Sequence, residues 1–255
     1  MASIDFKRAT GSDPKKIARA FGVWFLLTWV FAIAARGLFD PAYNDPDFIL
    51  GVGSGFRVQL GAVFEFLLLI ANIATAVVLY PIVKRQSQIG ALGYVTARIM
   101  ESAFLMVGLL SLVSLVTLRQ DLAGATGVEA AALEATGGTL VSVYEFGFLF
   151  GPGLVVGFGN GLLLGWLMYS SGLIPRGLAM VGLIAGPCLI VAFALVLFGV
   201  IETGSSGQAL SSLPEMVWEG ALPIYCIWKG FRSSPVISLD DRVPAVERGM
   251  ATATS

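Results

Sequence analysis

The chain has 255 residues, of which 56% are hydrophobic and 13% are charged, and its mean hydropathy is +0.82. Soluble domains carry about 25% charged residues, so this composition predicts an integral membrane protein. The net charge of −1 excludes the basic surface that nucleic-acid binding needs, and the absence of histidine excludes histidine-based catalysis and histidine metal ligation.

Six apolar segments alternate with polar ones, and each is close to the length of about 20 residues that a membrane-spanning helix needs. They predict an all-α bundle over residues 17–230. A polar segment precedes the bundle at 1–16, and the composition predicts a disordered tail at 231–255. The expected transmembrane helices cover residues 17–35, 58–80, 91–118, 139–169, 177–201 and 212–230.

Two connections carry particular expectations. The acidic, alanine-rich stretch 119–138 predicts a short helix outside the bilayer. Ser212-Leu-Pro214-Glu215 has the pattern of a helix start, with Ser212 as the cap, proline in the first turn and Glu215 returning to the cap.

The fourth span is rich in glycine, with small residues four apart in several registers. This pattern favours close packing of helices in lipid. The alternative is a helix bent or broken near Pro152 that lines a cavity.

Lysine and arginine in short flanks indicate orientation, because basic residues are retained on the cytoplasmic side. They concentrate in 1–16, 81–90, 170–176 and the flank after residue 230, whereas the remaining loops are mainly acidic. We therefore expect a multi-pass membrane protein with both termini in the cytoplasm.

Several polar residues interrupt the spans. Arg98 and Glu101 lie one helical turn apart and share a face. Counting about 1.5 Å per residue from the cytoplasmic ends places Asn72, Arg98, Asn160, Glu101 and Glu219 in one slab of the membrane. An ionisable residue inside a membrane is a functional-site hypothesis, and its alternative is a neutral pair that holds helices together. The candidate site is Glu65, Asn72, Arg98, Glu101, Asn160 and Glu219, with Tyr94, Glu145 and Glu215 as a secondary group.

One arginine cannot neutralise Glu65, Glu101 and Glu219 together. At least one carboxylate is therefore expected to be protonated, hydrated or bound to a cation, and Arg98 is expected to pair with Glu101 or Glu219. The sequence shows no cofactor motif and no metal-ligand spacing, and Cys188 and Cys226 fall in apolar segments without a paired spacing. The tryptophans lie mostly near helix ends, which predicts interfacial anchoring.

The combined pattern resembles the family called domain of unknown function 4386, over roughly residues 15 to 232. The segments that carry the resemblance are Asn72 to Val77-Val-Leu-Tyr-Pro81, Lys84-Arg85, Tyr94 to Glu101, Gly157-Phe-Gly-Asn160-Gly, Ile174-Pro-Arg-Gly-Leu-Ala179 and Pro214-Glu215 to Phe231. The resemblance implies a six-helix bacterial inner-membrane protein and supplies no reaction, ligand or partner. By position it implies the motif residues Glu65, Asn72, Arg98, Glu101, Asn160, Pro175, Glu215 and Glu219.

Three functions agree with these features. The first is a transporter or channel for protons, cations or a small solute that uses intramembrane carboxylates. The second is a non-enzymatic membrane component with a regulatory or assembly role, in which the polar set only locks the helices together. The third is an intramembrane enzyme that acts on lipids by carboxylate chemistry. The lipid bilayer is the expected partner in all three, and no cofactor is expected.

Overall fold

The computed structural model describes residues 13–51, 53–121 and 124–238, and this part of the chain is helical without strands. Five helices are long and apolar enough to cross a membrane. Large apolar side chains on their outer faces are exposed, such as Ile33, Val77 and Leu110, as expected for surfaces that contact lipid. These helices indicate a multi-pass membrane protein.

The helices are as follows, in chain order: α1 (Pro14–Leu38), α2 (Asp40–Asn44), the 3-10 helix η2 (Pro46–Leu50), α3 (Gly55–Val83), α4 (Gln88–Asp121), α5 (Val128–Phe148), the π-helices η3 (Leu149–Val155) and η4 (Gly157–Leu164), α6 (Gly165–Ser171), α7 (Arg176–Leu197), α8 (Ser206–Trp228) and α9 (Pro235–Ser238). The five candidate spans are α1, α3, α4, the continuous helix Val128–Ser171 and α7. The helix α8, which corresponds to the sixth predicted span, is not among them.

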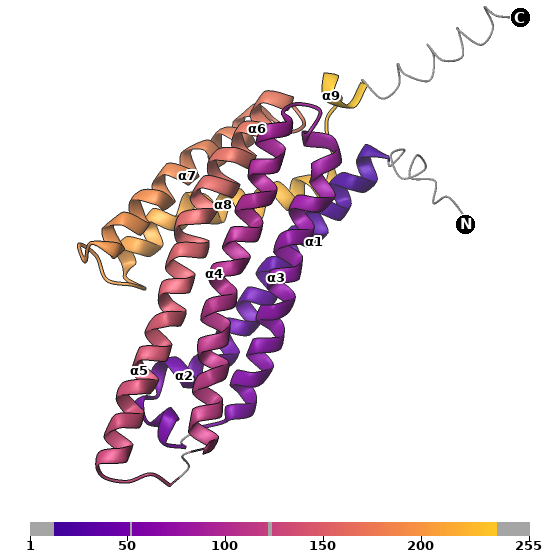
Figure 1. The fold of residues 1–255 in the computed structure, drawn as a ribbon. Helices are drawn as coiled ribbons and strands as arrows, with labels where there is room; N and C mark the ends of the chain where they lie inside the picture. Colours follow the sequence, from indigo (N-terminus) through magenta and orange to yellow (C-terminus); the bar gives the residue numbers. More distant parts are fainter. Residues whose placement is uncertain (1–12, 52, 122–123, 239–255) are drawn as a thin grey trace, which may run out of the picture.

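Helix packing closes a ring around an interior. Neighbours pack in the order α1, α3, α4, the α5–η4 helix, α7, α8 and back to α1. In Figure 1, α7 and α8 run to a loop at mid-height on the left, whereas α4 and α5 continue to the lower end beside α2. The start of α1 and the short helix α9 lie at the opposite, upper end.

Two apolar cores fill this ring, and polar residues lie between them. One core contains Leu79, Tyr94 and Trp218, and the other contains Leu69 and Leu105. Along α3 and α4 the two cores are separated by Asn72, Arg98 and Glu101, which are buried. The fold therefore places these buried polar residues, which we call the polar slab, between two apolar layers.

Two predicted boundaries differ from the structure. The stretch 128–138 forms no separate helix, because it begins the long helix Val128–Ser171. The helix α8 starts at Ser206, where Ser205 caps it by accepting a bond from the Gln208 amide, so the start predicted at Ser212 is wrong. The hydroxyl of Ser212 donates instead to the carbonyl of Gln208 within the helix, at 2.9 Å.

Residues 231–238, which the composition assigned to a disordered tail, pack against the bundle. The Arg232 amide donates to the Leu173 carbonyl at 2.8 Å, the Ser234 hydroxyl donates to the Ser171 carbonyl, and Val236 is buried. The rest of the predicted tail and most of the predicted N-terminal segment lie outside the described residues.

Candidate functional site

Arg98, Asn72 and Glu101 form a closed polar network between α3 and α4. Arg98 Nη1 donates to Glu101 Oε2 at 2.6 Å, and Nη2 donates to Asn72 Oδ1 at 2.5 Å. Asn72 Nδ2 donates to Glu101 Oε1 at 3.0 Å, so both carboxylate oxygens are occupied. Of the two partners predicted for Arg98, the structure shows Glu101. This network neutralises one carboxylate with the one arginine of the polar slab.

Glu219 is held by neutral donors. Asn160 Nδ2 donates to its Oε1 at 2.5 Å, and the indole of Trp29 donates to its Oε2 at 3.4 Å. Trp218 in turn donates to the backbone carbonyl of Asn160 at 3.0 Å. Glu219 thus joins α8 to α1 and η4 without an ion pair in the described part of the chain.

Glu215 lies one turn before Glu219 in the interior of α8, and it is the least satisfied carboxylate of the site. Its side chain is buried, with 4% of the residue exposed, and neither carboxylate oxygen has a hydrogen-bond partner among the described residues. The capping role that the sequence predicted for it is wrong, because the helix begins nine residues earlier at Ser206. Arg98 interacts with Glu215 and Glu219 only at longer range, since its ion pair is with Glu101.

The π-helical stretch positions Asn160 beside α8. Residues 149–155 and 157–164 form π-helices, with Pro152 inside the first. Such helices are rare and are often found at functional sites. Within η4, a Cβ atom on Gly161 would stand 2.3 Å from the Cα of Gly186 in α7 and 3.3 Å from Glu215 Oε2. The glycines of this span allow the close packing that the sequence favoured. The helix is not broken near Pro152, because Val128–Ser171 is continuous, but it is π-helical there and Pro152 lines a cavity.

A cavity of about 390 Å³, which we call the central cavity, borders these groups. Its walls come from α1, α3, α4, α5, η3, α7 and α8, and Pro152 and Gly153 of η3 line it. The polar network and both α8 carboxylates contribute to the wall, whereas most other lining residues are apolar. The acidic side chains at the central cavity are Glu101, Glu215 and Glu219.

Glu65 lies in a separate environment. A second cavity of about 430 Å³, the Glu65 cavity, is lined by Arg36, Glu65, Tyr144 and Glu145 among others. The Tyr144 hydroxyl donates to Glu65 Oε1 at 3.2 Å, and Oε2 of this buried carboxylate has no partner. The two cavities share lining residues, among them Leu68, Leu105 and Phe148. Glu65 and Glu219 therefore face adjoining spaces.

The secondary candidates differ in their surroundings. Tyr94 is fully buried in the apolar core, and Glu145 is exposed at the Glu65 cavity. Sequence reasoning missed Tyr144, and it assigned Trp29 and Trp218 to the membrane interface. Trp218 is fully buried and bonds to η4. A helical projection of α8 could have shown that Trp218 follows Glu215 by three positions and shares its face.

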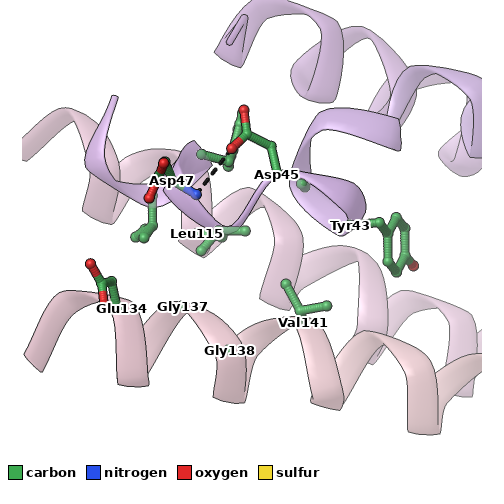
Figure 2. A pocket seen from close by; sticks show the side chains of 11 residues that line it. Tyr43, Asp45, Asp47, Leu115, Glu134, Gly137, Gly138 and Val141 are labelled. Carbon is green, nitrogen blue, oxygen red and sulfur yellow. Dashed lines mark hydrogen bonds between the residues drawn. The ribbon is translucent and has the colours of Figure 1, made fainter. Parts of the chain in front are cut away.

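Figure 2 shows a third pocket, of about 320 Å³, between the α2–η2 segment and α5. It is acidic, but Asp47 and Glu134 are exposed, and the Asp45 carboxylate accepts a bond from the Asp47 amide at 3.0 Å. No group of three or more potential metal-ligating side chains was found among the described residues that could hold a metal ion. We therefore centre the candidate site on the two cavities between the long helices.

The fold and the cavities define an all-helical, multi-pass membrane protein with a polar interior. The family model described as domain of unknown function (DUF4386) matches residues 20–230, and the chain belongs to this family. The resemblance seen in the sequence is thereby confirmed. Comparison with curated proteins and with solved structures found no match.

Proposed function

We propose that the chain crosses the bacterial inner membrane six times, with α8 as the sixth span and both termini in the cytoplasm. At 23 residues, α8 extends about 34 Å at 1.5 Å per residue, which is enough for the hydrocarbon core of about 30 Å. Its low hydropathy has a local cause, because Glu215 and Glu219 are turned toward the interior. Basic residues lie at three helix ends: Lys15 is in the first turn of α1, Arg85 follows the end of α3 and Lys229 follows the end of α8. These positions support the proposed orientation.

We propose that the protein is a small transporter or channel in which intramembrane carboxylates carry protons or other cations. The observation that supports this most is Glu215, a buried carboxylate whose two oxygens have no partner and which lines the central cavity. Three carboxylates border this cavity, and the guanidinium of Arg98 is committed to one of them. Leaving a second and a third carboxylate charged and unpaired would be costly, so the site favours an exchangeable proton or cation.

The adjoining Glu65 cavity supports a path for protons or other cations rather than a single closed cavity. It lies toward the α2 end of the bundle and shares a wall of Leu68, Leu105 and Phe148 with the central cavity. Its own carboxylate, Glu65, has one unpartnered oxygen. Two adjoining cavities that share apolar side chains are an arrangement in which small side-chain movements can open or close a passage.

The non-enzymatic role remains a second candidate on one observation. The network of Arg98, Asn72 and Glu101 is internally satisfied, as expected for residues that only join helices. An enzymatic role has no comparable support from the geometry.

Flux measurements in reconstituted vesicles separate the two roles. Wild-type protein should dissipate an imposed pH gradient or sodium gradient, and Glu219→Gln or Glu215→Gln should abolish the flux while the protein still folds. Glu202→Gln is the matched control, because Glu202 is exposed in the loop before α8. A wild-type protein that moves neither protons nor cations would favour the non-enzymatic role.

A further inference from the structure

The rim of the central cavity is apolar and exposed. Ile33 of α1, Phe148 of α5 and Met216 of α8 line the cavity, and their exposed fractions are 69%, 47% and 52%. In a multi-pass protein such side chains face lipid. The cavity therefore adjoins the bilayer through an apolar edge, and an apolar molecular body can enter along it.

The deeper wall of the central cavity contains hydrogen-bond acceptors that have no donor among the described residues. Glu215 has two buried carboxylate oxygens that receive no hydrogen bond from the described residues. Two of the neighbouring donors are used by other groups, since Arg98 donates to Asn72 and Glu101 and the Trp29 indole donates to Glu219. The hydroxyls of Thr28 and Ser212, which also line the cavity, donate to carbonyls of their own helices. A ligand that supplies positive charge fits this wall, and an anion does not.

Two aromatic residues, Trp29 and Phe148, line the cavity. Aromatic side chains attract ammonium groups and also provide an apolar surface. A bare metal ion fits less well, because hard cations take six or more oxygen ligands and the described residues hold no suitable group of three metal-ligating side chains. The volume of about 390 Å³ lies in the range of sites for small organic molecules.

We propose that the central cavity binds a small organic cation, an amine or quaternary ammonium with an apolar body, with its charge beside Glu215 and Glu219 and its body against Trp29 and Phe148. This inference rests on the proposed transport function and names its solute class. Binding is an exchange: the cation enters, the proton held by a carboxylate leaves to solvent, and the net charge of the site stays the same.

The test uses benzyltrimethylammonium with the purified full-length protein in detergent. Calorimetry should show saturable binding, and a pH indicator in weak buffer should show release of about one proton per bound cation. Benzenesulfonate and benzyl alcohol, which keep the ring without the positive charge, should not bind. Wild-type binding that is absent, or equal for the sulfonate, would overturn the proposal.

Two variants locate the site. Glu215→Gln should remove proton release and weaken binding by about tenfold or more, because the charge partner is lost. Ala32→Trp keeps every charge and fills part of the cavity, so it should abolish binding even if Glu215→Gln does not fold. The control Glu202→Gln should bind as the wild type does. Unchanged binding by Ala32→Trp would place the cation elsewhere and overturn the assignment.

These experiments distinguish a failure of the organic-cation inference from a failure of the transport proposal. If vesicles show proton flux but the protein binds no benzyltrimethylammonium, the organic-cation inference is wrong and the transport proposal stands. If the cation binds with proton release but vesicles show no flux, the binding site stands and the transport proposal fails.

Discussion

The hydroxyl of Tyr144 donates to Glu65 Oε1 at 3.2 Å and so joins α5 to α3 at the wall of the Glu65 cavity. Tyr144 also packs edge-on against Phe39 and Tyr43, with ring centroids 5.5 and 5.4 Å apart. Packing against Phe39 and Tyr43 fixes the ring of Tyr144, and the ring places its hydroxyl beside Glu65. Without this hydrogen bond, neither oxygen of Glu65 would have a hydrogen-bond partner among the described residues.

Removing that donor should destabilise the protein. Tyr144→Phe leaves Glu65 buried without a hydrogen bond, which costs about 1–3 kcal/mol. Thermal unfolding in detergent should show a lower midpoint, and Glu65→Gln added to Tyr144→Phe should recover part of the loss because the buried group is then neutral. Tyr225→Phe is the control. A midpoint equal to wild type for Tyr144→Phe would show that the bond contributes nothing to stability.

Arg98→Ala should sharply lower the yield of folded protein. It leaves Glu101 buried without its cation, and breaking a buried pair in this way costs about 3–5 kcal/mol. Arg98→Ala combined with Glu101→Gln should recover part of the yield in size-exclusion chromatography, whereas the exposed control Arg176→Ala should behave as wild type. A double variant no better than the single one would contradict the pairing as the source of the loss.

Gly161→Ala should prevent η4 from packing on α7. The added Cβ would stand 2.3 Å from the Cα of Gly186, so the backbones must separate. Overpacking costs about 1–3 kcal/mol where side chains can move, and here the obstacle is backbone. Gly177→Ala is the matched control, because nothing lies within 4 Å of its Cβ position. The measurement is again thermal unfolding, and equal midpoints for the two variants would refute the close approach.

Hydration of the two cavities can be measured by cysteine labelling. In a background of Cys188→Ala and Cys226→Ala, Gln208→Cys should react with a membrane-impermeant thiol reagent, because Gln208 lines both cavities. Leu222→Cys, on the same helix but fully buried, should not react. Equal protection of both positions would mean that the cavities are closed to water.

The six-span proposal predicts reporter positions. Tags after Met1 and at Ser255 should report the cytoplasm, and a tag inserted in 124–138 should report the outside. Opposite locations for the two termini would establish an odd number of spans, and α8 would then lie outside the membrane or only partly enter it.

Hydropathy was enough to predict the all-helical class and the approximate positions of the long helices. Helical spacing placed Arg98 and Glu101 on one face, because residues three apart share a face. It left Glu101 and Glu219 open as partners of Arg98, and the structure shows Glu101. Pairings between distant segments were not accessible in this way. Nothing local to Glu219 indicates that Asn160 or Trp29 will reach it, since these contacts depend on how η4 and α1 are rotated.

Two errors concern where a helix begins. Ser212, Pro214 and Glu215 fit a helix start, yet Ser205 caps α8 instead and proline is accommodated within the helix. The acidic stretch 119–138 was predicted to form a separate short helix, although residues 128–138 begin the long helix Val128–Ser171. In both cases the helix extends beyond its apolar segment through residues that are mostly exposed. Local helix signals account for these extensions, because Ser205 caps α8 and alanine, leucine and glutamate in 128–138 favour helix.

Gly161 and Gly186 do not line the central cavity, yet their close approach fixes how η4 lies against α7. Asn160 reaches Glu219, and Trp218 reaches Asn160, only while η4 lies against α7 with no side chain between them. A methyl group on Gly161 would alter the alignment of Asn160 and Glu219, and it would also stand 3.3 Å from Glu215 Oε2. The spacing of two backbones therefore governs both the alignment of Asn160 with Glu219 and the room around the Glu215 carboxylate.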